Sequence, residues 1–134
     1  MVNASAAEVF RKIHQVSQWW AKKVKGKTEA LNERFTVDFG TTWVDFQITE
    51  FEPGKRVVWK VTDCNLEWIK DKKEWNSTAV VFEIAEMKEA TKIDFTHVGL
   101  VPSFECYEDC RAGWTEHVTG SLVMFINEGK GMPQ

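Results

Sequence analysis

The segment Ser103–Glu128, SFECYEDCRAGWTEHVTGSLVMFINE, has the clearest periodicity in the chain. Side chains suited to one buried face recur at steps of three and four residues: Tyr107, Cys110, Trp114, Val118, Ser121 and Phe125. Polar residues fall on the opposite side: Glu105, Asp109, Glu116 and Asn127. This spacing is typical of an amphipathic α-helix. The segment therefore predicts one long helix, with the ring of Trp114 buried at the centre of its apolar face.

Five runs before this helix alternate apolar and polar residues, which is the period of a β-strand with one buried face. They are Glu33–Phe39, Thr42–Phe51, Lys55–Thr62, Trp75–Ala85 and Thr91–Leu100. Most of them are joined by short turns, and short links connect antiparallel neighbours. We therefore expect an α+β fold in which a curved antiparallel sheet wraps around the long C-terminal helix.

The N-terminal region predicts two short helices. Ser5 and Glu8 have the spacing of a capping box, so a first helix begins there and ends near His14. A second short helix covers Ser17–Ala21. Further along, Asp63–Glu74 is the one break long enough to form a mobile loop, and its apolar residues are placed to cover the mouth of a cavity.

Composition indicates a single domain over residues 1–134. The chain is 43% hydrophobic, enough to bury a core without disulfides or metal. Its net charge of −3 argues against a nucleic acid as the main partner, because phosphate binding needs a basic face. The lysines of residues 22–27 are expected to form a solvated loop edge. Neither a signal-like N-terminus nor a long uncharged apolar run is present, which predicts a cytoplasmic protein without a membrane span.

The three cysteines predict neither a disulfide framework nor a metal site. Their odd number and the absence of a zinc-type spacing favour a reducing compartment. Cys106 and Cys110 lie one helical turn apart, but His117 is roughly 10 Å beyond Cys110 along the axis, too far to share an ion. Cys64 follows the outward parity of its strand. No metal and no cofactor are therefore expected.

Strand alternation also identifies the inward-facing side chains, which are unusually aromatic. The residues expected to wall a cavity between sheet and helix are Phe46, Trp59, Phe82, Phe95 and Trp114. His97 shares the strand face of Phe95, and His117 lies beside the helix stripe, about 60° from Trp114. We expect both histidines to contact a ligand in this cavity. A closely packed core without a cavity is the alternative interpretation of the same pattern.

The two histidines are expected to position a ligand rather than to catalyse a reaction. No nucleophile motif accompanies them, and His97 has no acidic neighbour on its own strand face to fix its tautomer. Glu116 points away from the side of the helix that carries His117. A histidine without an orienting partner is a poor general base but an adequate hydrogen-bond donor or acceptor. No catalytic residue is therefore assigned.

The order of several short motifs resembles that of a known superfamily. A capped helix is followed by Trp19-Trp20, then by ITEFEPGKRVVW at residues 48–59, by THVGL at residues 96–100, and by Gly113-Trp114 in the final helix. This order is similar to that of the START-like superfamily, also called SRPBCC, which has the helix-grip fold. It most resembles the branch named for the activator of the ninety-kDa heat-shock chaperone ATPase.

This resemblance implies a seven-stranded or nearly seven-stranded antiparallel sheet around the C-terminal helix, often with an apolar ligand between them. The family usually opens with a full strand before the capped helix, whereas only three residues precede Ala4 here. We therefore expect a very short first strand.

Three classes of function fit these observations. The preferred one is binding of a small, largely apolar or aromatic molecule in the cavity. The second is a chaperone partner or other protein-interaction module, as the branch name implies. The third is an enzyme of the cyclase or hydrolase type acting within the same cavity, because this superfamily shares a fold without sharing one reaction.

Overall fold

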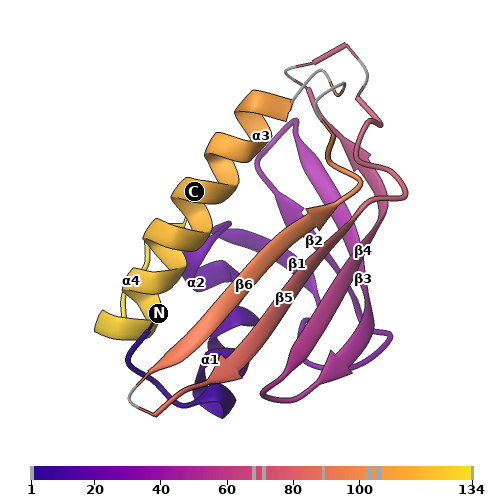
Figure 1. The fold of residues 1–134 in the computed structure, drawn as a ribbon. Helices are drawn as coiled ribbons and strands as arrows, with labels where there is room; N and C mark the ends of the chain where they lie inside the picture. The colour runs from indigo at the N-terminus through magenta and orange to yellow at the C-terminus, as the bar shows by residue number, and fades with distance from the viewer. Residues whose placement is uncertain are drawn as a thin grey trace.

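The computed structural model describes residues 2–67, 69–70, 72–88, 90–101, 104 and 107–133. These residues form one antiparallel sheet with its strands in sequence order. The strands are β1 (Lys23–Gly26), β2 (Arg34–Asp38), β3 (Trp43–Glu52), β4 (Arg56–Asn65), β5 (Ala79–Glu86) and β6 (Thr91–Val98). The sheet curves around a long C-terminal helix (Figure 1). The expected α+β, helix-grip architecture is confirmed.

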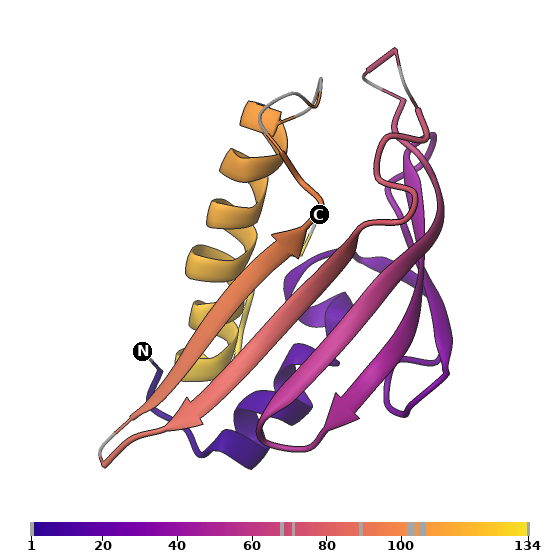
Figure 2. The ribbon, with the colours of Figure 1, turned by 45° about the vertical axis from the view of Figure 1, so that its right-hand side comes forward.

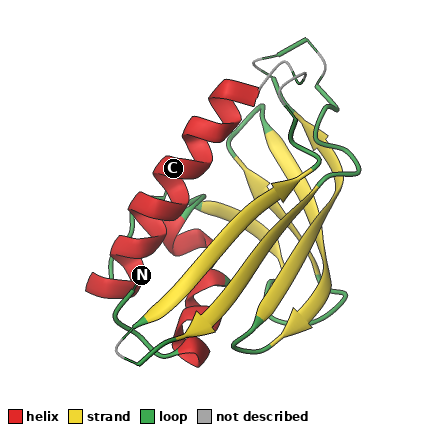
Figure 3. Cartoon of the chain, in the orientation of Figure 1, coloured by secondary structure: helices red, strands yellow, loops and turns green. Residues whose placement is uncertain are grey.

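Three consecutive segments build the long helix: α3 (Tyr107–Trp114), η1 (Thr115–Leu122) and α4 (Val123–Glu128). Figure 2 shows this helix crossing one face of the curved sheet. Two short helices, α1 (Ala6–Ile13) and α2 (Val16–Trp19), lie on the same side of the sheet (Figure 3). Helix α1 contacts β5 and α4, whereas α2 contacts β1 and η1. The two short helices therefore close one end of the interior.

Local chemistry explains where α1 begins and how it is attached. The Ser5 hydroxyl accepts a hydrogen bond from the Glu8 backbone N–H at 3.2 Å, which satisfies a free donor in the first turn. The Lys12 ammonium lies 3.4 Å from the carbonyl oxygen of Phe125 and 3.5 Å from that of Ile126, near the end of α4. A cation at a helix C-terminus is stabilising, so this contact ties α1 to the long helix.

The middle of the long helix has π-helical turns, which are wider than those of an α-helix. The Thr115 hydroxyl donates to the Arg111 carbonyl at 3.0 Å, and the Thr119 hydroxyl donates to the Thr115 carbonyl. Such back-bonding competes with the regular helix ladder. The helix ends at Gly129, whose φ of 79° suits a residue without a Cβ. Its expected start, Ser103, lies outside the described residues.

The expected buried stripe of this helix is confirmed. The buried members are Cys110, Trp114, Val118, Ser121 and Phe125, with Tyr107 partly exposed. Glu116 and Asn127 are exposed on the opposite side, whereas Asp109, which was also expected there, is exposed at the wall of the pocket described below. The wider turns add Leu122 and Ile126 to the buried set.

Strand β1 was not predicted from the sequence. Lys23 and Lys25 were expected in a solvated loop, but Lys23–Gly26 pairs with β2 as an edge strand. Four residues are too few to establish a period, and the lysines are exposed as expected of side chains that protect a sheet edge. At the other edge, Val2 and Thr91 form a single β-bridge. Among the described residues, this bridge is the pairing that the segment before α1 makes with the sheet.

The prediction that Cys64 points outward is wrong, and an irregularity in the sheet is the reason. Phe46 pairs with Val61, but the preceding Asp45 pairs with Asp63, so Thr62 has no opposite residue. One extra residue in a strand reverses the side-chain alternation beyond it. Cys64 is consequently fully buried.

Aromatic residues dominate the core beneath α1 and α2. The largest side chains without solvent exposure there are Trp19, Phe35, Phe46, Trp59 and Phe82. Phe35 and Phe46 are stacked with ring centroids 5.3 Å apart, and Trp59 meets Phe82 at 5.1 Å. We call this set, together with His14, the closed end of the interior.

Candidate ligand-binding site

A pocket of about 310 Å³ opens at the other end of the interior, between the sheet, the start of the long helix and the β4–β5 loop. It is lined by Trp20, Phe39, Thr42, Val44, Leu66, Trp75, Asp109, Cys110, Gly113, Trp114 and His117. Four of these carry large aromatic rings, and few polar groups join them. Apolar walls with a few polar groups are the usual composition of a small-molecule site. We call this region the open end.

Trp114 is the central residue of the open end. It faces the sheet and is only 6% exposed, as the helix periodicity predicts. Its ring lies 4.9 Å from that of Trp20, 5.8 Å from the nearly parallel ring of Trp75 and 4.7 Å from that of Phe95. Helix α3 therefore contributes one indole that links α2, the β4–β5 loop and β6.

A chain of hydrogen bonds fixes His97 behind this ring. The Trp114 indole N–H donates to His97 Nδ1 at 3.0 Å. Nδ1 is therefore an acceptor, so the proton lies on Nε2, which donates to the Thr78 hydroxyl at 2.8 Å. That hydroxyl donates to the Trp75 carbonyl at 2.6 Å. The expectation that His97 lacks an orienting partner is wrong, because its partners come from the helix and from the residue preceding β5 rather than from its own strand.

Burial determines the charge of His97. Loss of solvent lowers the pKa of its imidazole to about 4. The ring is therefore neutral at pH 7, and both nitrogens are already occupied. His97 does not line the pocket and supports the Trp114 ring from behind.

His117 does line the pocket. It is half-buried in η1, and its ring lies 6.4 Å from that of Trp20. Burial lowers the pKa of this imidazole, with a smaller opposing effect from Glu116. Because the π-helical turns rotate each residue by less than 100°, His117 lies more than the expected 60° from Trp114. Within the described part of the chain, no hydrogen bond or ring contact joins it to His97.

The other residues predicted for the site lie deeper. Phe46, Trp59 and Phe82 have no solvent exposure and belong to the closed end. Phe95 is partly buried between Phe82 and Trp114, at 5.1 and 4.7 Å. The structure brings Trp114 and His117 to the pocket wall, whereas contacts of a ligand with the deeper four side chains stay a prediction.

Sequence reasoning missed two aromatic residues of the wall. Trp75 was expected to begin a strand, but β5 begins only at Ala79, so Trp75 lies in the preceding turn, where it is buried. Its backbone carbonyl accepts the Thr78 hydroxyl, which helps to hold that turn. Trp20 belongs to the Trp19-Trp20 motif that supports the family resemblance. That motif does not indicate whether the Trp20 ring faces the core or the pocket.

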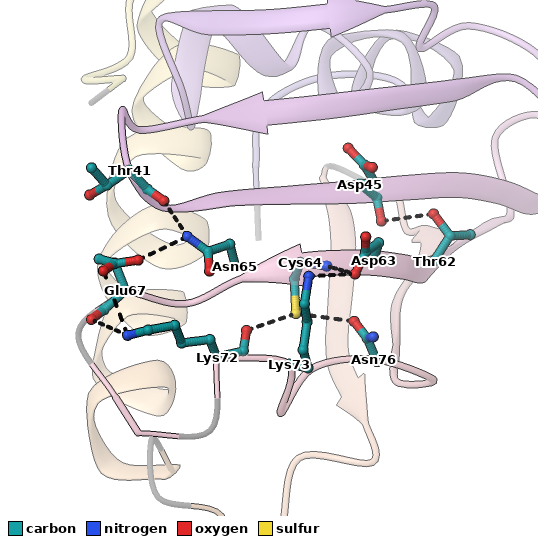
Figure 4. Close-up of polar contacts among 10 residues, drawn as sticks. All are labelled: Thr41, Asp45, Thr62, Asp63, Cys64, Asn65, Glu67, Lys72, Lys73 and Asn76. Atoms are coloured by element: carbon teal, nitrogen blue, oxygen red, sulfur yellow. Dashed lines mark hydrogen bonds and ion pairs between the residues drawn. The ribbon is translucent and has the colours of Figure 1, made fainter.

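The β4–β5 loop, which supplies Leu66 and Trp75 to the wall, is tied to the sheet by polar contacts. The Leu66 N–H donates to the Lys72 carbonyl at 2.8 Å. Figure 4 shows the Cys64 thiol between the Lys72 carbonyl and the Asn76 side chain, at 3.5 and 3.2 Å, and Lys73 paired with Asp63 at 2.9 Å. The Lys73 hydrogen bond holds the pKa of Asp63 below its usual range. The expected mobility of this loop stays a prediction, and its Trp68 lies outside the described residues.

Among the described residues, no group of three or more His, Cys, Asp or Glu side chains is placed to hold a metal ion. Cys106 lies outside that part of the chain. No helix in the described ranges is both long and apolar enough to cross a membrane.

Solved structures with the same fold include Aha1 from Colwellia psychrerythraea, determined as a dimer. It aligns with a TM-score of 0.80 at 20% identity, over 97% of this chain and 93% of that one. CalU16 from Micromonospora echinospora aligns at 0.70 and 18% identity, over 97% and 71% of the two chains. DynU16, from the dynemicin biosynthetic locus, aligns at 0.71 and 19% identity, over 97% of this chain but 46% of that one.

No protein-family model and no curated protein matches the chain. The structural likeness at these identities shows a common fold. The chain has the helix-grip fold, as the resemblance in the order of its sequence motifs implies.

Proposed function

We propose that the open end binds a small, largely apolar or aromatic molecule. The observation that carries this proposal is the pocket of about 310 Å³, walled by Trp20, Phe39, Trp75 and Trp114. This volume lies at the lower end of the range for pockets that hold small organic ligands. The rings of Phe35, Phe46, Trp59 and Phe82 pack against one another at the closed end, so the pocket is a local feature of the fold.

The hydrogen bonding of Trp114 supports recognition by shape and stacking. Its indole N–H is directed to His97 and does not project into the pocket. A ligand would therefore meet the ring of Trp114 and those of its neighbours. Because His97 and Thr78 hold the indole in one orientation, little side-chain entropy is lost on binding.

The same geometry favours binding over turnover. Both His97 nitrogens already have partners. His117, which faces the pocket, has no hydrogen-bonded orienting group among the described residues, and a general base needs one. Among the described residues, the most exposed large apolar side chains are Leu31, Met87, Val98, Val101 and Met132, which come from several parts of the chain.

A variant that fills the pocket tests the proposal directly. Gly113 lines the pocket from α3, and a Cβ added there meets no atom within 4 Å. Gly113→Leu therefore places a side chain where the ligand would lie without a backbone clash. Gly120→Leu is the matched control, because Gly120 lies on the same long helix, also has an open Cβ position and is outside the pocket wall.

We expect 2-naphthalenemethanol, a neutral aromatic probe, to bind the wild-type chain saturably in a calorimetric titration. Gly113→Leu is expected to weaken binding at least about tenfold, whereas Gly120→Leu keeps it within about twofold. Thermal unfolding of both variants checks that each is folded. Equal binding by wild type and Gly113→Leu would remove the pocket as the site.

A further inference from the structure

We infer that the open-end pocket selects aromatic ligands that carry a positively charged group, with Asp109 as the residue that recognises the charge. This inference rests on the proposed function and specifies the ligand class. Among the residues that line the pocket, Asp109 is the one carboxylate, and none is a lysine or arginine. Its neighbour in the wall, His117, is neutral there because burial lowers the pKa of the imidazole.

Helix geometry places the Asp109 carboxylate on the rim. Asp109, Gly113 and His117 are successive residues at steps of four, and all three line the pocket. They form a strip beside the buried row that contains Cys110 and Trp114. A ligand stacked on Trp114 therefore has the carboxylate at its outer, solvent-facing end, where a charged group stays hydrated.

Among the described residues, none is paired with the Asp109 carboxylate. The nearest basic residue on the same helix, Arg111, pairs with Glu108 at 3.2 Å. No ion pair or hydrogen bond to the Asp109 side chain is found in the described part of the chain. The N-terminal end of α3 supplies an opposing partial charge of roughly +0.5, about half the magnitude of the carboxylate charge.

The aromatic walls reinforce this preference. Ring faces carry a negative quadrupole and attract cations, and tryptophan does so most strongly. Three tryptophans meet at the pocket, with the Trp20 and Trp75 rings 4.9 and 5.8 Å from that of Trp114. An ammonium group lying between these rings and Asp109 would interact favourably with both, whereas a carboxylate in the same place would be repelled by both.

Three probes of one shape test the inference: 2-naphthalenemethylamine, which is a cation at pH 7, 2-naphthalenemethanol and the anion of 2-naphthoic acid. Calorimetric titration of the wild type at low salt is expected to show the amine binding about tenfold more tightly than the alcohol, with the acid weakest. The preference should shrink as salt is added, because the charge lies near solvent.

Two variants decide whether Asp109 is responsible. Asp109→Asn is expected to reduce the preference for the amine over the alcohol from about tenfold to about threefold or less, the part that the tryptophan rings supply, while the affinity for the alcohol is unchanged. Glu116→Gln removes the same charge from an exposed position of the long helix outside the pocket wall, and it should keep the preference. A preference as large in Asp109→Asn as in the wild type overturns the inference, as does equal binding of amine and alcohol by the wild type.

These results separate the two proposals. If the alcohol binds and Gly113→Leu abolishes its binding, the proposed function stands whichever charge is preferred. If none of the three probes binds the wild type, the proposed function and the charge selectivity both fail.

Discussion

The two ends of the interior use aromatic residues differently. At the closed end, Trp59 has no solvent exposure, and its indole N–H and the Nε2 atom of His14 have no hydrogen-bond partner among the described residues. At the open end, the indole N–H of Trp114 and both nitrogens of His97 are hydrogen-bonded. The closed end is thus optimised for packing at the cost of two unsatisfied polar atoms. The open end keeps its side chains oriented around a pocket, which is what a binding site requires.

The largest expected effect lies at the closed end. Trp59→Ala should lower the free energy of unfolding by about 3–5 kcal/mol, because it leaves a large cavity among rigid neighbours. Trp59→Phe should cost less, since it keeps a ring and removes the unpartnered N–H. Chemical denaturation of both variants measures the difference. A Trp59→Ala variant as stable as wild type would show that the closed end does not support the fold.

A smaller effect should follow from pH at the open end. The unfolded chain protonates His97 near pH 6.5, but the folded chain does so only near pH 4, because burial disfavours the charged ring. Stability is therefore full above pH 6.5 and falls as the pH drops from 6.5 to 4. The shift corresponds to about 3 kcal/mol at most for this residue.

His97→Gln separates this contribution from that of His14, whose pKa is also lowered by burial. Glutamine can accept from the Trp114 N–H and donate to Thr78, so the variant should fold and show a weaker loss of stability between pH 6.5 and 4. Urea denaturation at several pH values measures the loss. An unchanged slope in His97→Gln would mean that His97 is not protonated differently in the folded and unfolded states.

The sequence predicts the architecture well because long periodic segments define it. The buried stripe of the C-terminal helix repeats every three or four residues, and the inward faces of β3, β4 and β5 repeat every second residue. The residues predicted for these faces are buried in the structure. Irregular local geometry sets the limit of such reasoning. The unpaired Thr62 turns Cys64 inward, and the late start of β5 folds Trp75 into the pocket wall. Neither feature produces a repeating pattern of apolar residues, so the sequence gives no sign of it.

The candidate site was accordingly predicted in part. Trp114 and His117 were found because they belong to the helix pattern, and both line the pocket. The partners of His97 are remote in sequence, since Thr78 and Trp114 come from two other segments. Contacts of this kind depend on tertiary packing, which one-dimensional spacing does not contain.

The most direct test of the account follows the seven tryptophan indole N–H signals in a two-dimensional ¹H–¹⁵N NMR spectrum during titration with 2-naphthalenemethanol. We expect the signals of Trp20, Trp75 and Trp114 to shift with one common saturation curve, because their rings surround the pocket. The signals of Trp19 and Trp59 should stay in place. Shifts of Trp59 as large as those of Trp114, or saturable binding that leaves all three open-end signals unmoved, would contradict the division of the interior into a packed end and a binding end.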